Sequence, residues 1–279
     1  MIKTYLCLMK PGIICGNTIT ALAGFLLASK SHFDFLLCIS TILGLALVMG
    51  SACVFNNYID RHRDQKMTRT KNRALVTGKI STTNARIFGT LLGLLGVFVL
   101  ALCTNPLTTS LALLGFFVYV VLYSFSKQHT TYATEIGSIA GAIPPVVGYT
   151  AVSNQLDLAA LLLFLVLVFW QMPHFFAIAM FRLDDYKAAS IPVLPAKKGI
   201  ATTKIQMLLY VIAFTLTTLL LTVCGYTGYA FLAVTTLFSI SWLWLAIQGL
   251  SSTDNTLWAK KMFRFSLIVI TLFSITIAL

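Results

Sequence analysis

Residues 54–73 have the sequence VFNNYIDRHRDQKMTRTKNR and directly follow a long apolar run. Two acidic residues, Asp60 and Asp64, share this short stretch with six basic residues. The rest of the chain is mostly hydrocarbon, because 58% of its 279 residues are hydrophobic and only 10% are charged. In so apolar a chain, two carboxylates at the end of an apolar helix indicate a binding or catalytic role.

Apolar segments recur along the chain, and each is long enough to cross a hydrocarbon core of about 30 Å. They are residues 11–29, 35–56, 86–103, 107–126, 136–152, 157–181, 203–224, 229–249 and 262–279. We therefore predict an all-α, polytopic membrane protein, a single domain (1–279) with nine transmembrane helices around a central cavity. Because the N-terminus has no cleavable signal pattern, its apolar segment is expected to remain as the first helix.

The basic residues predict how these helices are oriented. All but Lys30 of the 20 Lys and Arg residues lie in the N-terminus or in every second connection between the predicted helices. Lys and Arg gather on the cytoplasmic side of membrane proteins, so the N-terminus and these connections are predicted to be cytoplasmic. The net charge of +12 then indicates contact with anionic lipid and no nucleic-acid partner. Most acidic residues fall on the same side, which predicts a polar site at the cytoplasmic mouth.

Asn56, Asp60 and Asp64 follow one another at intervals of four residues, which places them along one face of a helix. Two carboxylates and a carboxamide form an oxygen-rich site of the kind that Mg²⁺ prefers, usually completed by substrate phosphates. The basic residues that would bind a diphosphate follow closely: Arg69, Lys71 and Arg73. The alternative is a solvated collar of helix-end carboxylates that pair with neighbouring arginines.

Several short motifs occur in a characteristic order between residues 10 and 205. They are KPGII (10–14) with Asn17, NNYIDR (56–61) with Asp64, RTKNR (69–73), WQMPHFF (170–176), RLDDY (182–186) and IPVLP (191–195). Together they resemble the UbiA-type intramembrane prenyltransferases, and most closely their protoheme IX farnesyltransferase (heme O synthase) branch. His62 departs from the pattern, since many relatives carry an acidic residue at that position, and we have no physical account of it.

The resemblance implies transfer of a farnesyl group from farnesyl diphosphate to a vinyl group of heme b. Water adds in the same reaction, and the products are heme O and diphosphate. It also implies a Mg²⁺ cofactor, a multi-pass protein of the cell inner membrane and an active site on its cytoplasmic side. Heme A synthase or a terminal oxidase is the candidate protein partner. Lys10 and Asn17 are placed among the substrate-binding residues by the resemblance alone.

Asp184 and Asp185 end the sixth predicted helix. In a prenyltransferase they would bind a second Mg²⁺ or approach the diphosphate from the side opposite Asp60 and Asp64. Asp185 is the stronger candidate for metal binding and catalysis, and Asp184 for substrate binding. The alternative is a pair of interfacial acids that form ion pairs with nearby basic residues.

Tyr119, Tyr123 and Lys127 recur at intervals of four residues along the fourth predicted helix. Lys127 would contact the diphosphate and is a candidate catalytic residue. The faces of the two tyrosine rings would stabilise a developing allylic cation. Aromatic stripes in membrane helices also serve packing alone, so this alternative stays open.

His174 lies inside the sixth predicted helix, beside Pro173. An ionisable residue within a membrane span is a candidate for function, and an imidazole could ligate or orient the heme substrate. The alternative is a histidine that only forms a hydrogen bond to a neighbouring helix.

Two other functions remain open at this point. A quinone-pathway aromatic prenyltransferase would share the first acidic motif, but its second motif has a further Asp where this chain has Ala188 and Ala189. A transporter of a metal or an anionic solute would also contain carboxylates. Transporters usually place such groups near the middle of the membrane, whereas here they lie at helix ends.

Overall fold

A computed structural model describes residues 2–30 and 32–278, and all the regular secondary structure in these ranges is helical. The elements are α1 (Ile2–Leu8), α2 (Pro11–Ser29), α3 (Phe35–Asp64), α4 (Thr82–Cys103), α5 (Pro106–Phe117), the π-helix η1 (Val118–Tyr123), α6 (Ser124–His129), α7 (Ala133–Ser153), α8 (Leu158–Phe181), α9 (Leu183–Ala188), α10 (Leu194–Lys197), α11 (Gly199–Val223), α12 (Tyr229–Leu250) and α13 (Asn255–Thr276). The prediction of an all-α protein is confirmed.

Eight helical segments among the described residues are long and apolar enough to cross a membrane. They include α2, α3, α4, α7, α8, α11, α12 and the continuous segment Pro106–His129, which joins α5, η1 and α6. The ninth predicted span falls in α13, whose first half carries Lys260, Lys261 and Arg264. The chain is therefore a multi-pass membrane protein, and both the count of nine spans and the orientation stay predictions.

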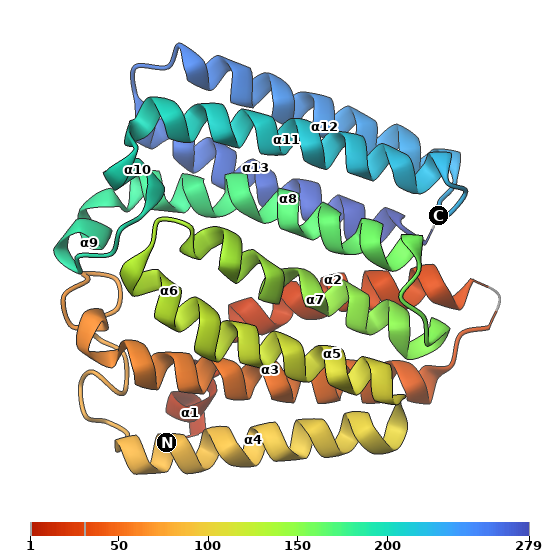
Figure 1. The fold of residues 1–279 in the computed structure, drawn as a ribbon, viewed down its shortest axis with the longest axis horizontal. Coiled ribbons are helices and arrows are strands. Elements are labelled where there is room, and N and C mark those ends of the chain that lie inside the picture. The colour runs from red at the N-terminus through yellow and green to blue at the C-terminus, as the bar shows by residue number, and fades with distance from the viewer. Residues whose placement is uncertain (1, 31, 279) are drawn as a thin grey trace.

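The long helices lie side by side in a layered bundle (Figure 1). Helix α3 packs against α4, α2 against α7, and α8 against α7, α11 and α13. One end of the bundle holds α6, α9, α10 and the connection between α3 and α4 (Figure 1). These are the segments that the charge pattern placed on one side of the membrane, so the predicted grouping is confirmed, while the name of that side stays a prediction.

Polar residues at the helix starts explain where several helices begin. The side chains of Asp34, Asn105 and Asp157 each accept a hydrogen bond from a backbone N–H in the first turn of the helix that follows. Such caps satisfy amide groups that have no partner within the helix. Asp34 and Asp157, the two acidic residues outside the predicted cytoplasmic side, are therefore occupied in capping α3 and α8.

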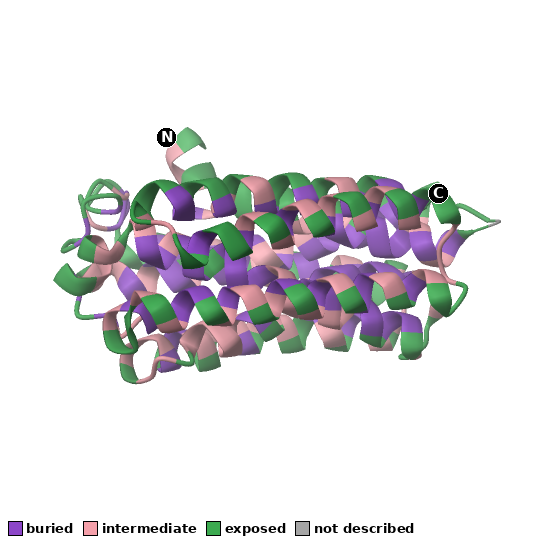
Figure 2. Ribbon diagram, turned by 90° about the horizontal axis from the view of Figure 1, so that it is seen from above, coloured by how far each residue is buried: buried purple, intermediate pink, exposed green. Residues whose placement is uncertain are grey.

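Helices α2 and α7 pack tightly against each other. Gly24 faces the Pro145 carbonyl and Gly148 faces the Ala21 carbonyl so closely that neither position has space for a Cβ. Small residues allow membrane helices to approach in this way. Buried positions line the inside of the bundle and exposed positions its outside (Figure 2). Many exposed positions are large and apolar, as a lipid-facing surface requires.

Candidate functional site

Asp60 lies at the end of α3 that faces the polar connections, and Lys127 of α6 approaches it from the neighbouring helical segment. The Lys127 Nζ donates a hydrogen bond of 2.7 Å to Asp60 Oδ2. The side chain of Asp60 is 2% exposed and that of Lys127 is 17% exposed. Both predicted site residues thus meet in a buried ion pair, where the attraction between opposite charges is much stronger than in water.

Asn56, one turn deeper in α3, joins two further elements to this pair. The Lys10 Nζ donates a hydrogen bond of 2.6 Å to Asn56 Oδ1. The Asn56 Nδ2 in turn donates to Ser124 Oγ at 3.3 Å. Asn56 therefore lies between the start of α2 and the start of α6, and its carboxamide oxygen is bound to a cation.

The π-helix η1 directly precedes α6 and carries both predicted tyrosines. The rings of Tyr119 and Tyr123 stack with centroids 5.5 Å apart. The Lys127 ammonium lies 5.9 Å from the centre of the Tyr123 ring. Short π segments are frequent at functional sites because they redirect side chains. The two tyrosines thus lie next to the ion pair, as their spacing predicts.

Asp64 forms a second ion pair, one turn after Asp60 and nearer the end of the bundle, in which the carboxylate is buried and its partner Arg73 is partly exposed. The Arg73 Nη1 donates a 2.7 Å hydrogen bond to Asp64 Oδ2. The Thr70 hydroxyl donates to the Asp64 backbone carbonyl at 2.9 Å. Connection 65–81 therefore folds back over the end of α3, and Arg73 occupies a carboxylate that we predicted for metal.

The second acidic motif contacts the same connection from the other side. Asp185 Oδ1 accepts a hydrogen bond of 2.9 Å from the Thr68 backbone N–H. The Arg69 Nη2 donates to the Tyr186 hydroxyl at 3.0 Å, and its guanidinium lies 5.1 Å from the centre of that ring. Helix α9 and connection 65–81 thus cover the ends of α3 and α8 together.

We call Asn56, Asp60 and Asp64 and the cations bound to them (Lys10, Lys127 and Arg73) the carboxylate cluster. The electrostatics of its inner part follow from burial. Burial, with smaller contributions from the positive charges of Arg73 and Lys127, lowers the pKa of Lys10 to about 8. Asp60 Oδ1 is buried without a hydrogen-bond partner. Because buried polar atoms are nearly always satisfied, this oxygen is suited to bind a cation or a ligand group.

The carboxylates do not form a closed metal cage. Within residues 2–30 and 32–278, no three His, Cys, Asp or Glu side chains come close enough to hold one metal ion. Mg²⁺ is usually held by one or two carboxylates together with substrate phosphates, so a partial ligand set is compatible with it. The unpartnered Asp60 oxygen fits such a set.

Three predicted site residues lie apart from these contacts. The Asn17 side chain donates to the Ile13 carbonyl within its own helix at 3.0 Å. Lys71 and Asp184 are exposed, and among the described residues no hydrogen bond or ion pair joins either side chain to the cluster. Their predicted roles in substrate binding remain predictions.

His174 is buried between α8 and α13. Its Nδ1 is 2.7 Å from the Ser266 hydroxyl, and its ring stacks on Trp170 with centroids 4.9 Å apart. This environment matches the alternative of a hydrogen bond to a neighbouring helix, and it leaves the predicted contact with heme untested.

Sequence reasoning missed three contact residues: Thr68, Ser124 and Tyr186. Ser124 is a polar residue inside an apolar span, which is a signal that the sequence contained. Thr68 contributes only its backbone N–H, which no sequence pattern reports. The Tyr186 contact depends on how α9 folds over connection 65–81.

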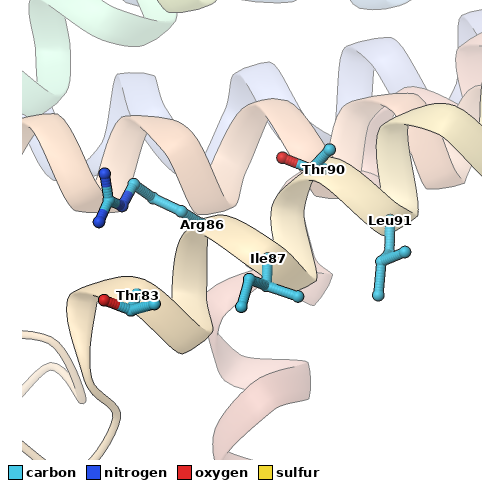
Figure 3. Close-up of a pocket in the computed structure, with 5 residues that line it drawn as sticks. All are labelled: Thr83, Arg86, Ile87, Thr90 and Leu91. Carbon is cyan, nitrogen blue, oxygen red and sulfur yellow. The ribbon is translucent and has the colours of Figure 1, made fainter.

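A surface hollow also lies away from these residues. A hollow of about 380 Å³ lies along α4 and is lined by Thr83, Arg86, Ile87, Thr90 and Leu91 (Figure 3). All five side chains come from one helix and are exposed. None of them is a predicted site residue, so this hollow is not the candidate site.

Comparisons with known proteins agree with this architecture. Two curated proteins, each called protoheme IX farnesyltransferase, match nearly the whole chain. The one from Protochlamydia amoebophila is 56% identical and covers 99% of this chain and 98% of its own length. The one from Cronobacter sakazakii is 50% identical, with 99% and 94% covered.

Solved structures share the fold at low sequence identity. A structure concerning digeranylgeranylglyceryl phosphate synthase has a TM-score of 0.82 at 20% identity and covers 99% of this chain and 97% of its own. A UbiA homolog from Archaeoglobus fulgidus bound to GPP and Mg²⁺ has a TM-score of 0.73 at 14% identity, with 99% and 100% covered. The model of the UbiA prenyltransferase family matches residues 17–268. Because that match spans most of the sequence, the chain belongs to the UbiA prenyltransferase family.

Proposed function

We propose that the protein transfers the farnesyl group of farnesyl diphosphate to a vinyl group of heme b. The C–O bond to diphosphate breaks, a C–C bond forms at the vinyl group, and water supplies a hydroxyl as a proton is released. Heme O and diphosphate are the products. The observation that carries the choice of acceptor is the near full-length match, at 50–56% identity, to relatives called protoheme IX farnesyltransferase.

The cations of the cluster suit the departure of diphosphate. Lys10 and Lys127 contact Asn56 and Asp60 deeper in the bundle, and Arg73 and Arg69 lie nearer its end. A diphosphate that binds between these two pairs of cations contacts positive groups that are already fixed in place. Preorganised charges stabilise the negative charge of a transition state without the need to reorganise.

Asp60 and Asp64, together with Asn56 and Asp185, are the residues that would hold Mg²⁺. The chemistry that Mg²⁺ supplies when bound is stabilisation of the charge on the leaving diphosphate. The UbiA homolog solved with GPP and Mg²⁺ supports this cofactor, since it shares the fold. Lys127 and Arg73 pair with the two carboxylates, so the cations that would contact phosphate oxygens lie directly beside the residues that would hold the metal.

The apolar helices and the covering connection protect the reaction. The farnesyl chain lies between apolar helices, and the stacked rings of Tyr119 and Tyr123 border the ion pair, where the allylic cation develops. Connection 65–81 and α9 limit the access of bulk water, which would otherwise capture that cation. We place the site on the cytoplasmic side of the cell inner membrane, because the basic connections gather at that end of the bundle.

The choice of acceptor can be tested directly with the purified full-length protein in detergent, Mg²⁺ and farnesyl diphosphate. Heme b and 4-hydroxybenzoate are offered together, and both products are followed by liquid chromatography and mass spectrometry. Farnesylated heme alone supports the proposal. Prenylated hydroxybenzoate without farnesylated heme would assign the chain to the quinone-pathway alternative. The transporter alternative is already set aside by the family assignment.

A further inference from the structure

A polar pocket lies next to the carboxylate cluster, between α1, the end of α3 and connection 65–81. Its volume is about 320 Å³. Four of its lining residues are cations, and no acidic residue is among those that line it. The polar side chains that matter here are Lys3, Lys10, Asn57, Asn72, Arg73 and Lys79.

The pocket rests on a well-packed part of the fold. Leu8 of α1 is 2% exposed and packs in one cluster with Val54 of α3, Leu75 and Ile80. The Asn57 Nδ2 donates a 2.9 Å hydrogen bond to the Leu8 carbonyl. Helix α1 is therefore fixed to α3 by both apolar and polar contacts, and the pocket is a stable feature of the fold.

The chemistry of the lining selects a class of ligand. Four cations gathered around one space repel each other, so an anion is the favourable occupant. Asn57 is 3% exposed, and its Oδ1 is buried without a partner. Since this oxygen only accepts hydrogen bonds, a matching ligand carries a donor beside its anionic group.

We propose that this pocket binds the phosphate group of an anion that also carries a hydroxyl donor. Two sources have this chemistry, the headgroup of phosphatidylglycerol and a free, protonated phosphate. Lys10 and Arg73 each contact the carboxylate cluster as well, through Asn56 and Asp64. The pocket therefore adjoins the carboxylate cluster and shares these two cations with it, whereas Lys3, Lys79 and Asn57 form no hydrogen bond or ion pair with Asp60 or Asp64 in the described part of the chain.

The position of α1 favours access from the lipid headgroup region. This helix projects sideways from the bundle next to the mark for the N-terminus (Figure 2). Its side chains Ile2 and Leu6 are 79% and 53% exposed. A short helix that projects from the bundle and exposes apolar residues is suited to the membrane interface. The pocket beside it would then lie at the depth of the phosphate groups.

The test uses the purified full-length protein and two probes. Short-chain phosphatidylglycerol is titrated in neutral detergent, with phosphatidylcholine as the headgroup control, and bound lipid is counted by native mass spectrometry. Inorganic phosphate is titrated separately by calorimetry. Variant K3Q/K79Q removes two pocket cations, and K260Q/K261Q removes two cations of α13 as the matched control.

Each basic group near an anionic surface contributes about fivefold in affinity, so K3Q/K79Q is expected to weaken binding about 25-fold. The control should retain the wild-type affinity. A loss confined to phosphatidylglycerol identifies a lipid headgroup, and a loss that includes inorganic phosphate identifies a free phosphate; either supports the pocket. Equal affinities of the two double variants for both probes would overturn it.

A second variant covers the case in which K3Q/K79Q does not fold. Asn72 is exposed and lines the pocket, so Asn72→Asp adds a negative charge there with little effect on packing. It should weaken the same probes, and unchanged binding would count against the proposal. Farnesyl transfer is measured on the same samples, so that failure of the pocket can be told from failure of the proposed function.

Discussion

Lys127 and Asp60 are 67 residues apart in the sequence, yet their charged groups meet at 2.7 Å in a buried ion pair. The pair joins α6 to the end of α3 and neutralises a carboxylate that is otherwise enclosed by the bundle. It therefore serves two purposes in our account. It stabilises the fold, and it keeps an ammonium group beside the carboxylate where diphosphate is expected to bind.

The first prediction concerns the stability of this pair. Lys127→Gln leaves Asp60 buried and unpaired, and loss of one partner of a buried ion pair costs about 3–5 kcal/mol. Asp60→Asn combined with Lys127→Gln removes both charges, so the double variant should be more stable than Lys127→Gln alone. Thermal unfolding in detergent measures both. Equal stability of the double variant and Lys127→Gln would show that the two charges are not coupled.

The second prediction separates the two acids of α9. Asp185→Ala removes the acceptor of the Thr68 N–H, and a hydrogen bond to a charged group contributes about 1.5–3 kcal/mol. We expect farnesyl transfer to fall by more than about tenfold, since connection 65–81 loses one of its contacts with α9. Asp184→Ala is the comparison, because that exposed side chain forms no hydrogen bond or ion pair with the cluster among the described residues, and its loss of activity should be smaller. Equal losses for both variants would contradict the assignment.

The third prediction is a pH dependence that rests on Lys10, whose pKa is lowered to about 8 mainly by burial. An anion beside Lys10 favours the protonated form, so binding of farnesyl diphosphate should weaken as the pH rises through 8. In Lys10→Arg this component should disappear, because the guanidinium stays charged throughout. The apparent affinity is measured between pH 7 and pH 9 for both proteins. An unchanged pH profile in Lys10→Arg would exclude Lys10 as the titrating group.

The fourth prediction concerns the metal. Removal of divalent cations with a chelator should abolish farnesyl transfer without unfolding the protein, because Lys127 and Arg73 already neutralise the two carboxylates. Addition of Mg²⁺ should restore the activity. Transfer at the full rate in the presence of the chelator, with no metal bound to the protein, would refute the role given to Asp60 and Asp64.

Much of the fold could be predicted because the membrane helices are determined by features of short sequence segments. Long apolar segments and the one-sided distribution of Lys and Arg identify membrane helices and group their connections without any tertiary contact. The spacing of Asn56, Asp60 and Asp64 likewise places them on one helix face. The helices extend beyond the apolar segments, however, since α3 continues to Asp64 and α4 begins at Thr82.

The pairing within the site could not be predicted, because it depends on the approach of distant elements. Arg73 was expected to bind phosphate, and the structure pairs its guanidinium with Asp64. The contact of Asp185 with Thr68 uses a backbone N–H, and the direction of Lys127 follows from the π-helix η1. None of these features has a signature in residue spacing.

The central claim is that Asp60 serves farnesyl transfer to heme. The most direct measurement is the formation of farnesylated heme from heme b and farnesyl diphosphate, followed by mass spectrometry, in wild type and Asp60→Asn. Thermal unfolding and spectra of bound heme confirm that both proteins are folded and loaded. We predict product with the wild type and a loss of at least about 100-fold with Asp60→Asn, the scale reported for removal of one charge-stabilising group. Undiminished product in Asp60→Asn would contradict the account.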